Sequence, residues 1–416
     1  MICLTQMTNG TTFWRGFVGS SFVVALLGVV CVDLWFANAN PLTSAPTVNL
    51  QRTEPFYAAQ EYRRQCRQLA AAPDVVLLGS SVMVSPVLQA ESLRLQSPLK
   101  RMRHRQCGEL AQALSAQGLG DRQVFNFAVG GCMISDAYWI TKNVLLADGR
   151  EKPRAIVYGV APRDIQDNIM QQTGIPGTES FQCLASVDDA LRVKNTVGMN
   201  WTKRLELVCA RISSLWRSRA DLVTLATLRG KKLLEAALPW VAFDKRLADG
   251  TIKAQRGGMF REEAIGEPMV VPGYGLEHIS TELTDQQYQF RYNPQSPRMN
   301  EVQLSYLEKL IALCRKEQVT LVIVNMPLSE HNHKLMPPAL YPMFVDRVAS
   351  ACRHGQVEFV DLAKTGCYTG DDNFVDGVHL SCERSRPFLK FLATQLSETK
   401  LSSALHPQVA TTGSAK

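Results

Sequence analysis

The chain lacks the motifs of several common functional classes. None of its 11 cysteines belongs to a Cys-x-x-Cys pair, so zinc-ribbon and thioredoxin-like sites are not supported. The sequence contains no internal repeat, no low-complexity tract and no nucleic-acid-binding motif. The formal net charge of +7 comes from scattered basic residues, apart from one cluster at Lys100–Arg105. That cluster predicts either a contact surface for acidic polymers or lipid headgroups, or a solvated face.

The amino-terminal part contains a long apolar run. Residues Gly16–Ala37 are largely apolar apart from Asp33, and a membrane span needs about 20 such residues. Arg15 precedes the run, whereas residues 38–51 contain no Lys or Arg, which predicts a cytoplasmic amino terminus and an exported remainder. Because Ala37-Asn38-Ala39 also matches a signal-peptidase site, the run is either an uncleaved anchor, which we favour, or a cleaved signal.

Beyond the anchor, short apolar runs alternate with amphipathic segments, which predicts an α/β domain with a parallel sheet. The rhythm breaks between about residues 175 and 300, where Leu205, Val208 and Ile212 recur at helical spacing. We interpret this part as a packed cap over the site; alternatively, its helices lie along the membrane surface. The predicted organisation is a tail and anchor at 1–39, a linker at 40–55, an α/β domain at 56–175 and 301–399 with a cap at 176–300, and a disordered tail at 400–416.

Three short segments that lie far apart in the chain carry candidate catalytic residues. Leu77–Ser81 is the end of an apolar strand followed by a glycine and two serines, which puts a hydroxyl at the carboxyl edge of the sheet. Asn126–Gly131 ends in two glycines, whose N–H groups can face a reacting oxygen without an intervening Cβ. Asp376–His379 places an acid three residues before a histidine. Serine, histidine and carboxylate are the parts of an activated hydroxyl nucleophile.

This combination resembles the SGNH (GDSL-like) hydrolase superfamily. The Gly-Ser-Ser block, the anchor and the late Asp-x-x-His-Leu-Ser are similar to its membrane-anchored bacterial branches, which include DltD-like and alginate-acetyltransferase-like proteins. The resemblance covers roughly residues 70–170 and 305–395. It implies a three-layer α/β/α fold with a cap insertion, and it implies no cofactor and no metal.

The resemblance also assigns roles by position. It makes Ser81 the nucleophile, His379 the base and Asp376 the residue that orients it, with the N–H groups of Ser81 and Gly131 in the oxyanion hole. Two further side chains at strand ends are candidate substrate contacts, namely Ser80 and Asn325.

One block departs from the family pattern. The family usually has Gly-x-Asn-Asp after the third strand, whereas this chain has Ala161-Pro162-Arg163-Asp164. Arg163 is predicted either to offer its guanidinium to an oxyanion or an anionic substrate group, or to form a salt bridge at a helix start.

The expected function is that of an esterase or O-acyltransferase at the plasma (inner) membrane. Its substrates would be a surface polysaccharide and an acyl donor, with a membrane acyltransferase as a candidate partner and no nucleic acid. Two alternatives remain open. The missing asparagine suggests a catalytically silent binding or assembly factor, and Glu330, His331 and His333 suggest a metal-dependent hydrolase.

Overall fold

The computed structural model describes residues 21–39, 41–44, 54–147, 151–169, 178–193, 201–219, 221–223, 226, 269–270, 272 and 281–406. They fall into two compact units, Met1–Gln51 with Trp201–Ala248, and Arg52–Asn200 with Asp249–Lys416. The predicted cap at 176–300 is therefore divided between the units, and residues 227–268 of it lie outside the described part.

The second unit contains a five-stranded parallel sheet with the order β3-β1-β4-β6-β7, which confirms the predicted α/β class. Its inner strands are almost continuously apolar because helices cover both faces. The chain runs outward from β1 to β3 and then returns to β4, so the direction of winding reverses between β1 and β4. The strands are β1 (Val75–Gly79), β3 (Val124–Asn126), β4 (Ala155–Val160), β6 (Thr320–Asn325) and β7 (Glu358–Asp361).

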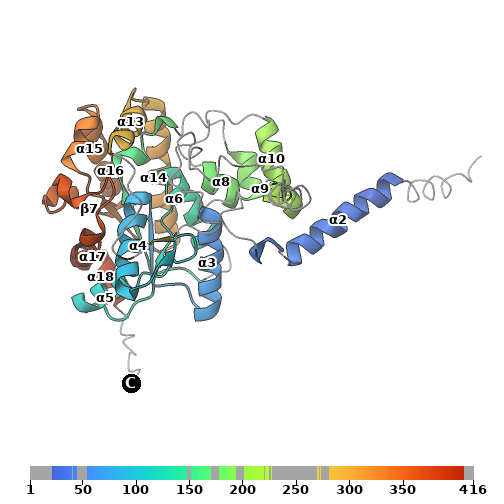
Figure 1. Ribbon diagram of the computed structural model, residues 1–416, viewed down its shortest axis with the longest axis horizontal. Helices are drawn as coiled ribbons and strands as arrows, with labels where there is room; N and C mark the ends of the chain where they lie inside the picture. The colour runs from blue at the N-terminus through green and yellow to red at the C-terminus, as the bar shows by residue number, and fades with distance from the viewer. Residues whose placement is uncertain are drawn as a thin grey trace, which may run out of the picture. The chain divides into compact units, whose positions relative to one another are not determined.

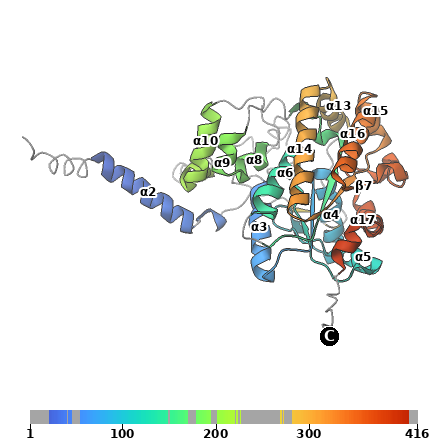
Figure 2. The same cartoon turned by 180° about the vertical axis from the view of Figure 1, so that it is seen from behind.

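Helices form a layer on each face of this sheet (Figures 1 and 2). One group packs together as α4 (Ser81–Leu95), α5 (Gly108–Leu114) and α17 (Cys382–Ser397). The opposite group includes α6 (Ile134–Ile140), α14 (Pro297–Lys316) and α16 (Leu340–Gly355). The remaining elements of this unit are α3 (Glu54–Leu69), α8 (Thr178–Leu184), α9 (Val187–Arg192), α13 (Thr281–Tyr292), α15 (Glu330–Leu335), α18 (Lys400–Leu405) and an antiparallel pair of β2 (Leu99–Lys100) and β5 (Met269–Val270).

The carboxyl-terminal prediction is wrong in part. The sequence predicts disorder over residues 400–416, but Lys400–Leu405 forms α18. Leu401 and Leu405 lie one helical turn apart and both are buried in the main core, so the segment gains enough apolar contact to fold. Residues 407–416 lie outside the described part.

The first unit contains α2 (Ser21–Ala39) and α10 (Trp201–Ile212). Asp33 on α2 accepts hydrogen bonds from the Ser213 hydroxyl at 2.9 Å and the Leu215 N–H at 2.7 Å. The predicted span begins at Gly16, outside the described part, and no described helix is long and apolar enough to cross a membrane. Leu205 and Ile212 are exposed on α10, whereas Val208 is half-buried, so the expectation that this stripe packs within the chain is wrong for Leu205 and Ile212.

Gly79, at the end of β1, lets α4 start directly against the sheet. It lies beside Gly159 of β4 and has a φ of +152°. A Cβ at Gly79 would lie 2.8 Å from the Gly159 carbonyl oxygen and 2.9 Å from the Met83 Cβ. The backbone and the first turn of α4 leave no room for any other residue.

We therefore expect Gly79→Ala to lower the free energy of unfolding by about 2–4 kcal/mol, because backbone strain and a steric clash add. Gly366→Ala is the matched control, since Gly366 also has a positive φ of +70°, but a Cβ placed there would have no atom within 4 Å. It should lose only the backbone cost of about 1–2 kcal/mol. Urea denaturation measures both; equal losses would show that the close approach at Gly79 is unimportant.

Candidate active site

The first two predicted segments meet at the carboxyl edge of the sheet. The chain leaving β3 runs beside β1, with the Phe127 N–H donating to the Leu77 carbonyl at 2.8 Å and the Val129 N–H to the Gly79 carbonyl at 2.9 Å. These bonds bring the glycine pair next to the serine pair. β1 also borders β4, and the winding reverses between these two strands, at the kind of place where open α/β sheets bind ligands.

The two serines of the first segment have different environments. Ser80 is only 1% exposed, and its hydroxyl forms a hydrogen bond with the Asp164 carboxyl. Ser81 is the first residue of α4 and is half-buried, and its N–H belongs to the first turn, which has no intrahelical acceptor. Ser81 is therefore the more accessible of the two serines, and the burial of Ser80 argues against its predicted substrate contact.

Asp164 is a buried carboxyl beneath this serine pair. It accepts a hydrogen bond from the Ala161 N–H at 2.9 Å, which is the expected contact of an acid at a helix start. Burial raises its pKa from 3.8 to about 7, although Arg163 and the Ser80 hydrogen bond oppose the shift. The Ser80 contact ties the first segment to the loop after β4.

The third segment forms the predicted acid–base pair. Asp376 Oδ2 lies 2.7 Å from His379 Nδ1, while Oδ1 accepts the N–H groups of Val378 at 3.2 Å and His379 at 2.9 Å. Burial raises the pKa of Asp376, but the hydrogen bonds from His379 and the backbone outweigh it and hold the pKa below its usual value. The carboxylate is thus charged and fixes the orientation of the imidazole.

The outer nitrogen of this imidazole has no hydrogen-bond partner among the residues that the structure describes. His379 is 6% exposed, and its Nε2 forms no hydrogen bond within the described part of the chain, so no bond to Ser81 is present. The loop is held by the Ser329 N–H, which donates to the Gly377 carbonyl at 3.1 Å. A buried ring nitrogen without a hydrogen bond is costly in a fold, so its position next to an oriented carboxylate requires an explanation.

Tyr288 on α13 lies near both the loop after β4 and the acid–base pair. Burial raises its pKa to about 12, and Arg163, Arg291 and Asp376 are close enough to influence it. Sequence reasoning missed this residue because it lies in the segment interpreted only as a cap. No short motif marks it, since tyrosine at helical spacing is ordinary packing.

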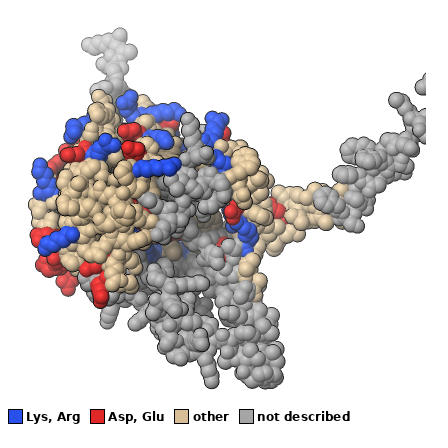
Figure 3. Space-filling view, turned by 90° about the horizontal axis from the view of Figure 1, so that it is seen from above, with Lys and Arg blue, Asp and Glu red and all other residues tan. Residues whose placement is uncertain are grey.

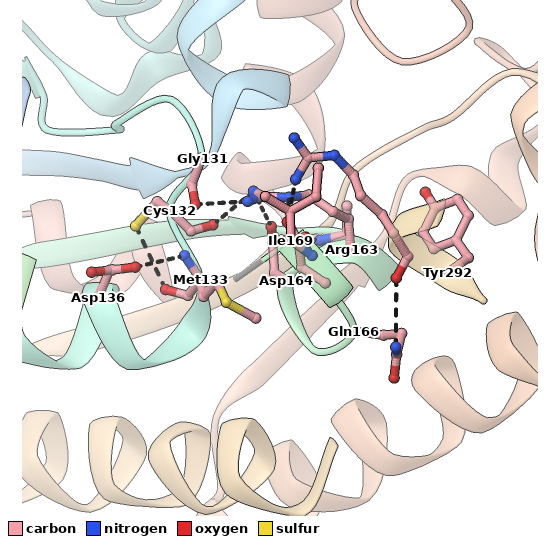
Figure 4. Close-up of polar contacts among 12 residues, drawn as sticks. Gly131, Cys132, Met133, Asp136, Arg163, Asp164, Gln166, Ile169 and Tyr292 are labelled. Carbon is pink, nitrogen blue, oxygen red and sulfur yellow. Dashed lines mark hydrogen bonds and ion pairs between the residues drawn. The ribbon is translucent and has the colours of Figure 1, made fainter. Parts of the chain in front are cut away.

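Arg163 combines a predicted contact with an unpredicted one. Its Nε donates to Asp167 at 2.8 Å, which is the salt bridge that one interpretation expected. Its Nη2 donates to the Gly131 carbonyl at 2.7 Å and its Nη1 to the Cys132 carbonyl at 3.2 Å (Figure 4). The guanidinium therefore binds the backbone of the glycine loop.

The basic cluster at Lys100–Arg105 is not a continuous charged surface. Arg101 and Arg105 are buried, and Arg105 donates to Glu54 at 3.0 Å and to the Ala128 carbonyl at 2.8 Å. The prediction of a binding or solvated face is wrong for these two arginines, because the buried Glu54 carboxylate requires cationic partners. On the face in Figure 3, basic and acidic residues occur together.

Asn325 is not brought to an accessible part of the site. Its side chain is buried, and Nδ2 donates to the Tyr341 hydroxyl at 3.1 Å and to Asp361 at 2.7 Å. The amide thus links β6 to β7 and α16. This placement argues against the predicted substrate contact.

The histidines of the alternative metal site face different partners. His331 Nε2 lies 2.8 Å from Asp285, whereas the His333 ring packs on the Tyr341 ring. Over the described ranges, no group of His, Cys, Asp and Glu side chains is arranged to hold a metal ion.

Comparison with known proteins identifies no family model and no curated protein that matches this chain. The resemblance to SGNH hydrolases therefore depends on the sequence motifs quoted above.

Proposed function

We propose that the chain is a membrane-anchored, extracytoplasmic serine esterase or O-acyltransferase that acts on ester-linked acyl groups of a cell-envelope polysaccharide or related polymer. One observation carries the proposal. His379 is oriented by Asp376, and its buried Nε2 has no hydrogen-bond partner in the described part of the chain. Ser81, its proposed proton donor, follows β1 at the edge of the sheet where the glycine loop also lies.

The proposed reaction is acyl transfer through a covalent intermediate. Nε2 of His379 accepts the Ser81 proton while Oγ attacks the ester carbonyl. The N–H groups of Ser81 and Gly131 stabilise the oxyanion, which is usually the largest catalytic contribution. His379 then protonates the leaving alcohol, and water or a sugar hydroxyl takes the acyl group from Ser81. The acceptor decides between hydrolysis and transfer.

A direct test uses the purified chain, a fluorophosphonate probe and 4-nitrophenyl acetate. Covalent labelling of the chain together with hydrolysis of the ester would support an activated serine. A folded chain that does neither would favour the silent binding or assembly factor, which the missing asparagine suggests. Loss of hydrolysis on adding a chelator would point instead to the metal-dependent alternative.

The first unit supports the proposed membrane location. Apolar side chains along α2 are exposed, as are Trp201 at 70% and Ile212 at 73% on α10. Trp201, Leu205 and Ile212 share one face of α10, and Arg204 and Arg211 lie on the same helix. An exposed apolar face on a basic helix such as α10 is typical of a segment that lies on an anionic membrane.

We expect the full chain to stay with the membrane fraction after an alkaline carbonate wash, because apolar burial by α2 and α10 does not depend on charge alone. A variant that lacks residues 1–39 should be released to a large extent. Immunoblotting of pellet and supernatant measures both. Release of the full chain by the wash would contradict the anchor.

A further inference from the structure

Two side chains hold the loop that carries Gly131, one on each side of the Gly130–Gly131 peptide group. On one side, the Gly130 N–H donates to Glu54 Oε2 at 2.9 Å. On the other side, the Gly131 carbonyl accepts from Arg163 Nη2 at 2.7 Å. The peptide between these two contacts contains the Gly131 N–H, the group assigned to the oxyanion hole.

This N–H is available to a ligand. Gly131 is exposed, and within the described part of the chain no hydrogen bond uses its N–H. The residue has a φ of +78°, a conformation that glycine adopts at little cost. The same freedom means that a Gly-Gly peptide turns easily, so its direction must be fixed by neighbouring contacts.

Both holding side chains are themselves fixed by buried charges. Glu54 is paired with Arg105 at 3.0 Å, and Arg101 lies 3.7 Å away. Arg163 is paired with Asp167 at 2.8 Å. Such charge-assisted bonds are stronger and more directional than neutral ones, and fixed dipoles are what an oxyanion hole requires.

We propose that Glu54 and Arg163 are positioning residues that aim the Gly131 N–H at the oxyanion. This inference rests on the proposed function and deepens it. The inference gives a role to the loop after β4, although this loop lacks the family's usual asparagine. Arg163 in this loop fixes the Gly131 N–H by bonding to the Gly131 carbonyl. The inference also gives a purpose to Glu54, which no motif identifies.

The test compares Glu54→Gln with Glu91→Gln. Glu91 is also a buried carboxylate that accepts the Glu109 N–H at 3.0 Å and pairs with Arg94, so it has the same kind of contacts away from the glycine loop. Both variants should lose similar thermal stability. We expect Glu54→Gln alone to lower kcat for 4-nitrophenyl acetate about 10- to 100-fold with little change in KM, less than the loss of a whole oxyanion donor.

Two further measurements distinguish a positioning role of Glu54 and Arg163 from a general effect on folding. Hydrogen exchange of the Gly130 N–H should accelerate in Glu54→Gln and stay unchanged in Glu91→Gln, independently of activity. Arg163→Lys keeps the charge but loses the planar fork that reaches two carbonyls, so kcat should fall with KM nearly constant.

The outcomes distinguish the two hypotheses. If wild type reacts with the ester and Glu54→Gln reacts equally fast, or loses no more kcat than Glu91→Gln, the positioning role is wrong while the proposed function stands. If folded wild type neither hydrolyses the ester nor labels with a fluorophosphonate, the proposed function fails and the catalytic role of the two residues fails with it.

Discussion

Replacement of Ser81 by alanine is expected to abolish labelling by a fluorophosphonate and to reduce ester hydrolysis by about a thousand-fold or more, the size of loss that follows removal of a nucleophile. The physical reason is that Ser81 is the accessible hydroxyl at the start of α4. Gel fluorescence measures labelling, and circular dichroism checks that the variant is folded.

Ser80→Ala is the matched control for this prediction. Ser80 precedes Ser81 directly, but it is buried and bonded to Asp164, so its removal should leave labelling in place. A variant that loses Ser80 and still labels at a comparable rate would assign the reaction to Ser81. Loss of labelling in Ser80→Ala with retention in Ser81→Ala would reverse the assignment.

The sequence could predict the elements whose pattern is local. The short apolar run at Thr320–Asn325 predicts a strand, and a strand is observed at those residues. A run of apolar, β-branched residues between two amphipathic segments is typical of a buried strand. The family resemblance predicts the pairing of Asp376 with His379, and the short spacing also lets Asp376 accept the backbone N–H groups two and three residues ahead.

Contacts between distant segments could not be predicted in the same way. Glu54 bonds to a loop 76 residues away, and Tyr288 comes close to Arg163 and Asp376 from a segment interpreted only as a cap. The arginines of the basic cluster illustrate the cause. Sequence shows their charge, but only the fold shows that Arg101 and Arg105 turn inward to a carboxylate.

Asp376→Asn should lower kcat by about 10⁴-fold while the fold is kept, as happens when the aspartate of a serine triad loses its charge. The geometry explains why the loss is so large. Asp376 Oδ1 accepts two backbone N–H groups, so an asparagine must keep its carbonyl oxygen there. Its NH₂ group then faces His379 Nδ1 and donates to it. The ring proton moves to Nε2, where it prevents the imidazole from accepting the Ser81 proton.

The chain supplies a matched control in a second aspartate–histidine pair. Asp285 lies 2.8 Å from His331 in a partly exposed position, and Asp285→Asn should leave kcat within about two-fold, as expected for a surface contact. Steady-state kinetics on 4-nitrophenyl acetate and fluorophosphonate labelling rates measure both variants. Equal activities of Asp376→Asn and wild type would mean that the imidazole does not act as the base. A large loss of kcat in Asp376→Asn alone would instead support the view that Asp376 sets the tautomer of His379, and that this tautomer is needed to activate Ser81.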